Sequence, residues 1–226
     1  MQAGNKTYET ESDLPSVIPV FPLPGALLLP RGQLPLNIFE PRYIAMIDAA
    51  LQSDRVVGMI QPSLDENEEM TSDNPDLCGV GCIGRLTSLQ ESGDGRYLIT
   101  LTGIARFDVL EEMPAVTPYR QCRVSINRFH DDLESGQGED DVDRQAVLRT
   151  FRAYLEANDM DADWEGIERA GNEALVNALS MMSPYGPAEK QALLEADDLK
   201  TRAETLIAIT EMDLARKAGG GEQILQ

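Results

Sequence analysis

The chain has 226 residues, 42% of them hydrophobic, which is enough for one large domain or two small ones with a real core. Its formal net charge at pH 7 is −20, from 39 acidic and 19 basic residues. Nucleic acids and anionic membrane leaflets bind cationic surfaces, so we expect neither as a partner. No apolar run approaches the roughly 20 residues that a membrane-spanning helix needs.

The amino terminus has neither the basic nor the apolar segment of a signal peptide, and we interpret residues 1–13 as a flexible tail. The three cysteines are an odd set. In one extended strand Cys78 and Cys82 lie about 13 Å apart, too far for a disulfide bond. We therefore expect reduced thiols, Cys122 included, and a cytoplasmic location.

Residues 17–54 organise the rest of the chain. Two short apolar segments, 17–21 and 34–39, are expected to be strands, and the prolines in and beside them favour bent or edge strands. Pro41 then suits the first position of a helix whose apolar residues recur at helical spacing as far as Leu51. The pattern predicts a small, irregular barrel with one helix packed against it.

Further strand patterns follow along the chain. The turn sequence Ser92-Gly93-Asp94-Gly95 joins two of them into a hairpin, with Leu101 on its buried face. Residues 63–76 are acidic and poor in large apolar side chains, so we interpret them as a mobile loop. The expected strands are residues 55–62, 78–90, 96–110 and 119–129.

Four blocks of sequence occur in a fixed order. They are residues 21–43 (FPLPGALLLPRGQLPLNIFEPRY), 55–62, 78–91 and 97–107, the last with Leu101, Gly103 and Arg106. Together they resemble the N-terminal substrate-binding domain of Lon proteases in its small stand-alone form, over about residues 15–215. The resemblance agrees with an α+β fold, a PUA-like pseudo-barrel of short strands with one helix followed by a C-terminal helical lobe. It also implies that the chain recognises protein clients.

Beyond residue 129 the composition changes from strand patterns to helical ones. An acidic segment with two glycines resembles a linker, and four or so amphipathic helical patterns follow it. Four or so short helices can bury their apolar faces only against each other and the barrel. We therefore divide the chain into a β-rich lobe at 14–129, a linker at 130–140, a helical lobe at 141–218 and a flexible tail at 219–226.

The catalytic motifs of full-length Lon are not recognisable in this sequence. A phosphate-binding loop requires a glycine before the Lys-Ser or Lys-Thr pair, and neither Lys6-Thr7 nor Lys200-Thr201 follows one. The family's peptidase serine lies in a Gly-Pro-Ser-Ala-Gly context, which Ser183-Pro184 does not match. We expect a protein that is not an enzyme, with no catalytic residue and no cofactor.

Metal sites are not expected either. The single histidine, His130, lies in the predicted linker beside two aspartates. Residues 159–163 have an aspartate at every second position, as the start of an EF-hand calcium loop does. The sixth position of such a loop should be glycine and is Trp164, and the twelfth should be glutamate and is Ala170. Asp163 as the N-cap of a following helix accounts for these acids.

Apolar side chains at element ends are candidates for contact with a client. One pair lies at the corner between a strand and the first helix, and one group lies at a break between two later helices. The alternative is that the aromatic residues close the barrel mouth, with Arg42 paired to Glu40 or to a backbone carbonyl. The candidates are Phe39 and Tyr43 at the corner, and Met181, Met182 and Tyr185 at the break.

Two functions remain open from the sequence. In the first, the chain binds exposed or unfolded segments of protein or peptide clients, and its acidic surface favours basic ones. In the second, it binds a small ligand in a pocket of the barrel or between the lobes. An open groove favours the first function, and an apolar cavity bounded by polar groups favours the second.

Overall fold

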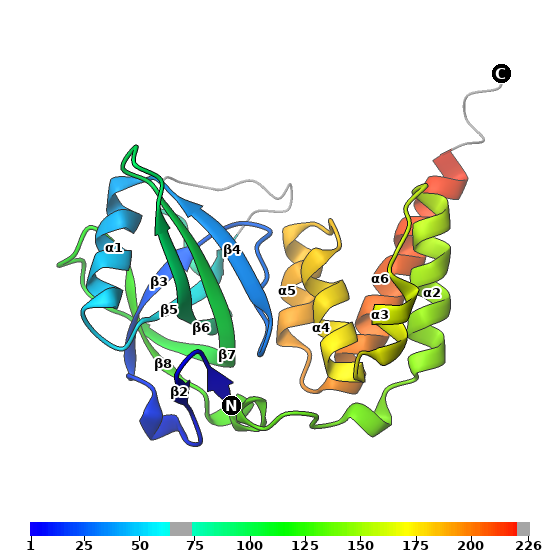
Figure 1. Cartoon of the computed structure of the whole chain (residues 1–226), viewed down its shortest axis with the longest axis horizontal. Helices are drawn as coiled ribbons and strands as arrows, with labels where there is room; N and C mark the ends of the chain where they lie inside the picture. Colours follow the sequence, from blue (N-terminus) through cyan, green and yellow to red (C-terminus); the bar gives the residue numbers. More distant parts are fainter. Residues whose placement is uncertain (64–73, 221–226) are drawn as a thin grey trace.

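The computed structural model describes residues 1–63 and 74–220, with side chains as far as Lys217. A β-rich lobe and a helical lobe lie side by side and are joined by one connection along the lower edge of the molecule (Figure 1). The predicted α+β fold is confirmed. Most of the predicted acidic loop at 63–76 lies outside the described residues, as do the last six residues of the predicted tail.

Five strands of the main sheet close into a barrel. β8 pairs with β3 and again with β7, which completes the ring β7-β6-β5-β3-β8. Only the β3–β5 pair is parallel among these described pairings. The strands of the sheet are β3 (Val17–Pro22), β4 (Gln33–Ile38), β5 (Val56–Pro62), β6 (Leu77–Glu91), β7 (Tyr97–Glu112) and β8 (Gln121–Ser125).

β4 is attached to the outside of this ring. It pairs with the first part of β7, from Tyr97 to Thr102, whereas β8 pairs with the last part, from Asp108 to Glu112. β4 is the terminal strand of the sheet order, so within the described residues its other edge has no strand partner. Pro35 lies in this strand, as expected for an edge strand.

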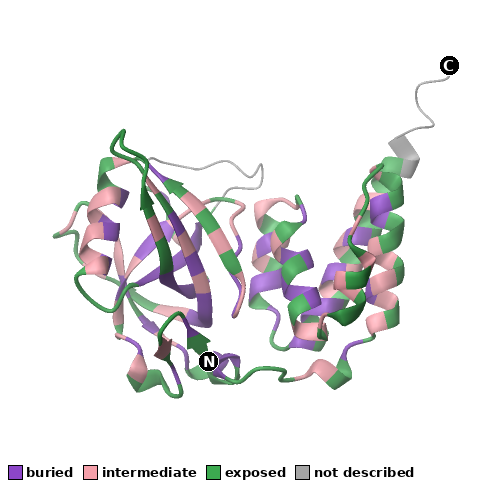
Figure 2. Ribbon diagram, in the orientation of Figure 1, coloured by how far each residue is buried: buried purple, intermediate pink, exposed green. Residues whose placement is uncertain are grey.

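The helix α1 (Pro41–Leu51) begins and ends where the sequence predicts. Its buried face packs into an apolar core that continues from the barrel into the helical lobe (Figure 2). Gly103 of β7 allows a close crossing, because a Cβ atom there would overlap the carbonyl oxygen of Leu29 and lie 2.8 Å from its carbonyl carbon. The segment before β4 can therefore lie directly on β7.

The interpretation of residues 1–13 as a flexible tail is wrong. They form β1 (Gln2–Ala3), β2 (Lys6–Thr7) and a short 3₁₀ helix, η1 (Glu11–Asp13). Tyr8 is fully buried, and its hydroxyl accepts a hydrogen bond from Arg85 at 3.0 Å. The amino group of Met1 donates to the carbonyl of Leu133 at 2.6 Å. Contacts with residues far along the chain order this segment, and a local pattern does not reveal them.

The predicted linker is also packed rather than free. The last strand ends at Ser125, earlier than predicted, and 3₁₀ turns η2 (Asn127–Leu133) and η3 (Glu139–Asp141) follow, with Asp132 and Leu133 buried.

In the helical lobe, Asp163 accepts a hydrogen bond from Gly166 at 3.1 Å and caps α3 as expected. The helices are α2 (Arg144–Ala157), α3 (Trp164–Arg169), α4 (Asn172–Met182), α5 (Pro187–Glu195) and α6 (Leu199–Gly220), which extends past the predicted end at 218.

Arg106 of β7 fixes the helical lobe on the barrel. Its Nε and Nη2 atoms donate to the two carboxylate oxygens of Asp132, each at 2.9 Å, and its backbone amide donates to the same carboxylate. Its Nη1 atom donates to the carbonyls of Leu194, in the last turn of α5, and Ala196, just after that helix. One buried side chain thus holds the barrel, η2 and the helices in a fixed arrangement.

Candidate client-binding site

A groove of about 430 Å³ lies between the two lobes. One wall is residues 30–35, at the start of β4, and the other is the face of α4 from Glu173 to Met182. We call it the interlobe groove. Its side chains are mainly apolar, because Leu34 and two prolines face small alanines and two methionines across it.

Contacts between the two walls hold the interlobe groove. A Cβ atom at Gly32 would overlap the sulfur of Met181, so the flexible Met181 side chain would have to move if a larger residue replaced this glycine. Asn177 donates from Nδ2 to the carbonyl of Pro30 at 3.2 Å, and its Oδ1 atom accepts from buried Arg202 at 3.0 Å. The groove is therefore a fixed feature of how the lobes pack.

The charged groups that line the groove are already paired. Arg31 donates from Nε to Glu173 at 2.8 Å and from Nη1 to the carbonyl of Asp132 at 2.7 Å. The second carboxylate oxygen of Glu173 accepts from the amide of Gly136 at 3.0 Å. A ligand in the groove therefore meets apolar side chains and a neutralised ion pair, not a free charge.

The structure separates the three candidates at the helix break. Met182 is 82% exposed and Met181 is half-buried, and both line the interlobe groove. Tyr185 is half-buried and lies outside the groove lining, where its hydroxyl is 2.7 Å from the hydroxyl of Thr210. The two methionines therefore belong to one surface and Tyr185 to another.

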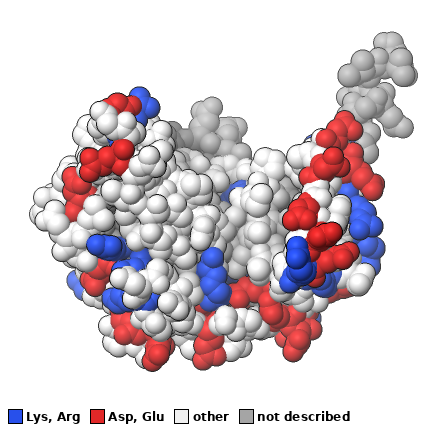
Figure 3. Space-filling model, in the orientation of Figure 1, with Lys and Arg blue, Asp and Glu red and all other residues white. Residues whose placement is uncertain are grey.

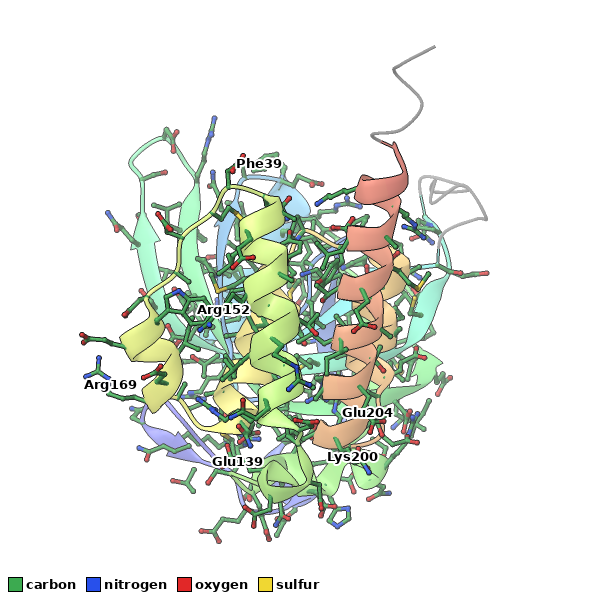
Figure 4. All side chains as sticks on the ribbon, turned by 90° about the vertical axis from the view of Figure 1, so that its right-hand side faces the viewer. Phe39, Glu139, Arg152, Arg169, Lys200 and Glu204 are labelled. Atoms are coloured by element: carbon green, nitrogen blue, oxygen red, sulfur yellow. The ribbon has the colours of Figure 1, made fainter. Side chains whose placement is uncertain are left out.

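At the strand-to-helix corner only Phe39 is available at the surface. It is 62% exposed at the upper end of the barrel (Figure 4) and does not line the groove. Tyr43 is only 6% exposed, with its ring centroid 4.1 Å from that of Phe21, and burial raises the pKa of its hydroxyl. Its assignment as a surface candidate is therefore a mistake. Arg42 is paired with Glu40 at 2.9 Å.

A second cavity, of about 330 Å³, lies at the end of the barrel. Prolines from several loops line it together with Tyr119 and two arginines. Arg120 donates to Glu112 at 2.6 and 2.5 Å and to the carbonyl of Pro75 at 2.7 Å, and the other arginine, Arg42, is also paired with a glutamate. This barrel-end cavity is one place that a small ligand could occupy.

Comparison with known proteins decides the family. The sequence profile of the ATP-dependent protease La (LON) substrate-binding domain matches residues 17–211, most of the chain. The chain belongs to the Lon substrate-binding domain family. Most of both lobes falls within the matched range, so the family membership covers the barrel, the interlobe groove and the helix that forms its second wall.

Curated relatives are much longer than this Lon substrate-binding domain. Lon protease 2 of Myxococcus xanthus is 28% identical over 208 residues, covering 88% of this chain and 24% of the relative. Lon protease of Anaeromyxobacter dehalogenans is 27% identical, covering 91% of this chain and 24% of its own length. The chain thus spans about a quarter of the length of these curated relatives.

Two solved structures share the fold of the family. The N-terminal domain of Mycobacterium avium complex Lon protease superposes with a TM-score of 0.63 at 19% identity, covering 86% of this chain and 98% of that one. A Lon N-terminal domain protein from Xanthomonas campestris gives 0.59 at 21% identity, with 85% and 97% covered. At these identities the likeness concerns the fold.

Lys190 has a structural role in this Lon-family chain and contacts the backbone of Ser180, not its hydroxyl. Lys190 donates from Nζ to the carbonyls of Ser180 and Met181 at 2.8 and 2.7 Å, which closes the C-terminus of α4. Burial lowers the pKa of Lys190 to about 8. The Ser180 hydroxyl is fully buried, so neither group is accessible to a polypeptide substrate.

Within the described ranges, no group of three or more His, Cys, Asp or Glu side chains is arranged to hold a metal ion. The helices of the same ranges include none that is both long and apolar enough to cross a membrane. Burial raises the pKa of Cys122 to about 11, so this thiol stays protonated at neutral pH.

Sequence reasoning missed the small residues of the groove. Ala174 and Ala178 are exposed on α4 and line it, four residues apart on one face. Their spacing beside two methionines was a visible signal for an open apolar face. The opposite wall at Gly32–Pro35 had no such signal, because it becomes a wall only when the lobes pack together.

Proposed function

We propose that this chain binds exposed or unfolded segments of protein clients in the interlobe groove and does not itself cleave them. The observation that carries the proposal is an apolar groove with fixed walls and a highly exposed methionine, Met182, at its rim. Membership of a family named for substrate binding supports it. Family membership alone does not fix a function, so the groove is the main argument.

The chemistry of the groove suits varied apolar side chains. Methionine is unbranched and polarisable, so Met181 and Met182 can pack against different partners. The surfaces on either side of the space between the lobes are mostly uncharged, and charged side chains gather along the lower edge and on the helical lobe (Figure 3). With a net charge of −20, the surroundings favour basic flanks around an apolar segment.

The proposal is tested by comparing how the chain binds one test protein in its unfolded and its native state. A fluorescent protein that has been reduced and carbamidomethylated, which blocks its thiols without adding charge, serves as the unfolded client, and the same protein in its native state is the control. We expect the unfolded form to bind and the native form not to bind. Equal binding of both forms, or of neither, contradicts the proposed function.

A matched pair of variants locates the contact. Met182→Asp places a charge at the groove rim and should raise the Kd for the unfolded client about tenfold, as expected for a contact worth 1–2 kcal/mol. Met160→Asp makes the same change at another exposed methionine, between α2 and α3, and should leave the Kd unchanged. Equal effects of both variants would mean that the added charge, and not the loss of an apolar contact at the groove rim, changes the Kd.

A small ligand in the barrel-end cavity is the second candidate function. Its support is the cavity of about 330 Å³ with rigid proline walls and the Tyr119 ring. A compound that raises the melting temperature of the chain, loses that effect in Tyr119→Ala and does not compete with unfolded protein would favour this function. Competition between such a compound and the unfolded client would count against it.

A further inference from the structure

β4 has an open edge in the described part of the sheet. Five strands pair in a ring, whereas β4 is attached outside it and pairs with β7 on one side only. The first part of β4 also forms one wall of the interlobe groove. An open backbone edge and an apolar groove therefore meet at the same place.

Two observations identify the backbone groups on the outer edge. The amide of Gly103 donates to the carbonyl of Gly32 at 2.9 Å, so residue 32 faces β7. Facing alternates along an antiparallel strand, which turns Gln33, Pro35 and Asn37 outward. Proline has no amide hydrogen, so Pro35 can face outward without the loss of a hydrogen bond to β7. Its position therefore agrees with the outward orientation of these three residues.

We propose that an extended client segment pairs with the outer edge of β4 as an added strand and places alternate side chains in the interlobe groove. This rests on the proposed function and specifies how the client is held. Outward backbone donors and acceptors are satisfied best by another extended backbone, and the groove beside them takes apolar side chains. The net charge of −20 selects segments with lysine or arginine flanks.

The edge also sets which segments fit. Gln33 and Asn37 each offer an N–H and a carbonyl, and Pro35 between them offers a carbonyl only. A client residue opposite Pro35 must therefore supply an N–H, so a proline at the centre of the segment is excluded. The recognised sequence is extended, apolar at alternate positions, basic at its ends and free of central proline.

The direct test uses a fluorescein-labelled peptide of about ten residues, long enough to cover a six-residue strand with its flanks. Valine and threonine alternate at its centre and lysines lie at both ends. We expect the wild-type chain to bind it and to lose most binding to the same peptide N-methylated throughout its centre, which keeps the side chains but removes the N–H donors. Equal binding of the two peptides overturns the strand pairing.

Two variants at one position test the edge from the protein side. Asn37→Pro removes an outward N–H and should raise the Kd of the peptide about tenfold, the effect of about one hydrogen bond. Asn37→Ala removes the side chain, keeps the backbone donor and should bind as the wild type does. Thermal unfolding of both variants checks the fold, and the N-methylated peptide gives the same answer without any variant.

The groove is tested by filling it. Ala178→Trp, at an exposed position on α4, should raise the Kd of the peptide at least about tenfold, whereas Ala153→Trp on α2 should not. If unfolded protein binds Asn37→Pro as it binds the wild type but binds Ala178→Trp weakly, the strand pairing fails and the proposed function stands. If Ala178→Trp also binds it as the wild type does, the groove is not the binding site and both proposals fail. If unfolded protein does not bind at all, the function itself fails. If the wild-type chain forms a dimer and Asn37→Pro dissociates it, the edge of β4 binds a second copy of the chain. That result would overturn the proposal.

Discussion

Replacing Arg106 by methionine should loosen the attachment of the helical lobe to the barrel. The Asp132 carboxylate is about 10% exposed and would keep only the backbone amide of residue 106 as a donor. Removing one partner of a buried ion pair costs about 3–5 kcal/mol, because the remaining charge is left uncompensated. The carbonyls of Leu194 and Ala196 lose a donor as well.

Urea unfolding at pH 7 measures this cost. With an m-value on the order of 2–3 kcal/mol per molar, the midpoint should fall by about 1–2 M. The only tryptophan, Trp164, lies on α3 and reports on the helical lobe, while far-UV circular dichroism reports on both lobes. We expect the two signals to coincide in the wild type and the tryptophan signal to change first in Arg106→Met.

A second substitution separates charge from packing. Asp132→Asn keeps an acceptor for the backbone amide of Arg106 but removes the buried negative charge. The double variant Arg106→Met/Asp132→Asn should therefore regain about half of the lost stability or more. A loss below about 1 kcal/mol in the single variant, or a double variant as unstable as the single one, would refute the reasoning.

Three further predictions concern the core. Leu101→Ala should cost about 2–5 kcal/mol in urea unfolding, because this side chain is fully buried, and a loss below about 1 kcal/mol would contradict its place in the core. Gly103→Ala should destabilise strongly against Leu29, whereas Gly79→Ala, with open space around its Cβ, should be close to neutral in the same assay, and equal effects would argue against the close crossing. Lys190 should contribute more stability as pH rises. Its pKa falls from 10.5 to about 8 on folding, so the unfolded chain binds more protons between those values, and the stability of the wild type relative to Lys190→Met should grow by up to about 3 kcal/mol from pH 7 to pH 10.5. A pH-independent difference would contradict the buried lysine.

Local patterns predicted the elements well. Pro41 and the apolar spacing after it gave the bounds of α1, and alternation gave the β6–β7 hairpin. The prediction of a flexible amino-terminal tail was wrong because Tyr8 is buried against residues far along the chain. The packed segment after β8 was missed for the same reason, since Asp132 finds its partner only when β7 and the helices come together.

The candidate site was predictable in part. Met182 lies at a helix end with incomplete packing, as the sequence suggested, and it is exposed. Tyr43 was misassigned although it shares a helical face with Ile47 and Ala50, both buried, so the periodicity already indicated a core position. The wall formed by β4 was not predictable, because it depends on how the contacts of Arg106 and Asn177 hold the two lobes together.

Hydrogen exchange of the outward amides of β4 is the most direct test of client binding at this edge. The amides of Gln33 and Asn37 face away from β7 and should exchange quickly in the free chain. The account predicts that a saturating unfolded client slows both at least about tenfold, without a comparable change in the barrel-end cavity around Tyr119. Unchanged exchange at both amides while the client is bound, or protection confined to the barrel-end cavity, would contradict it.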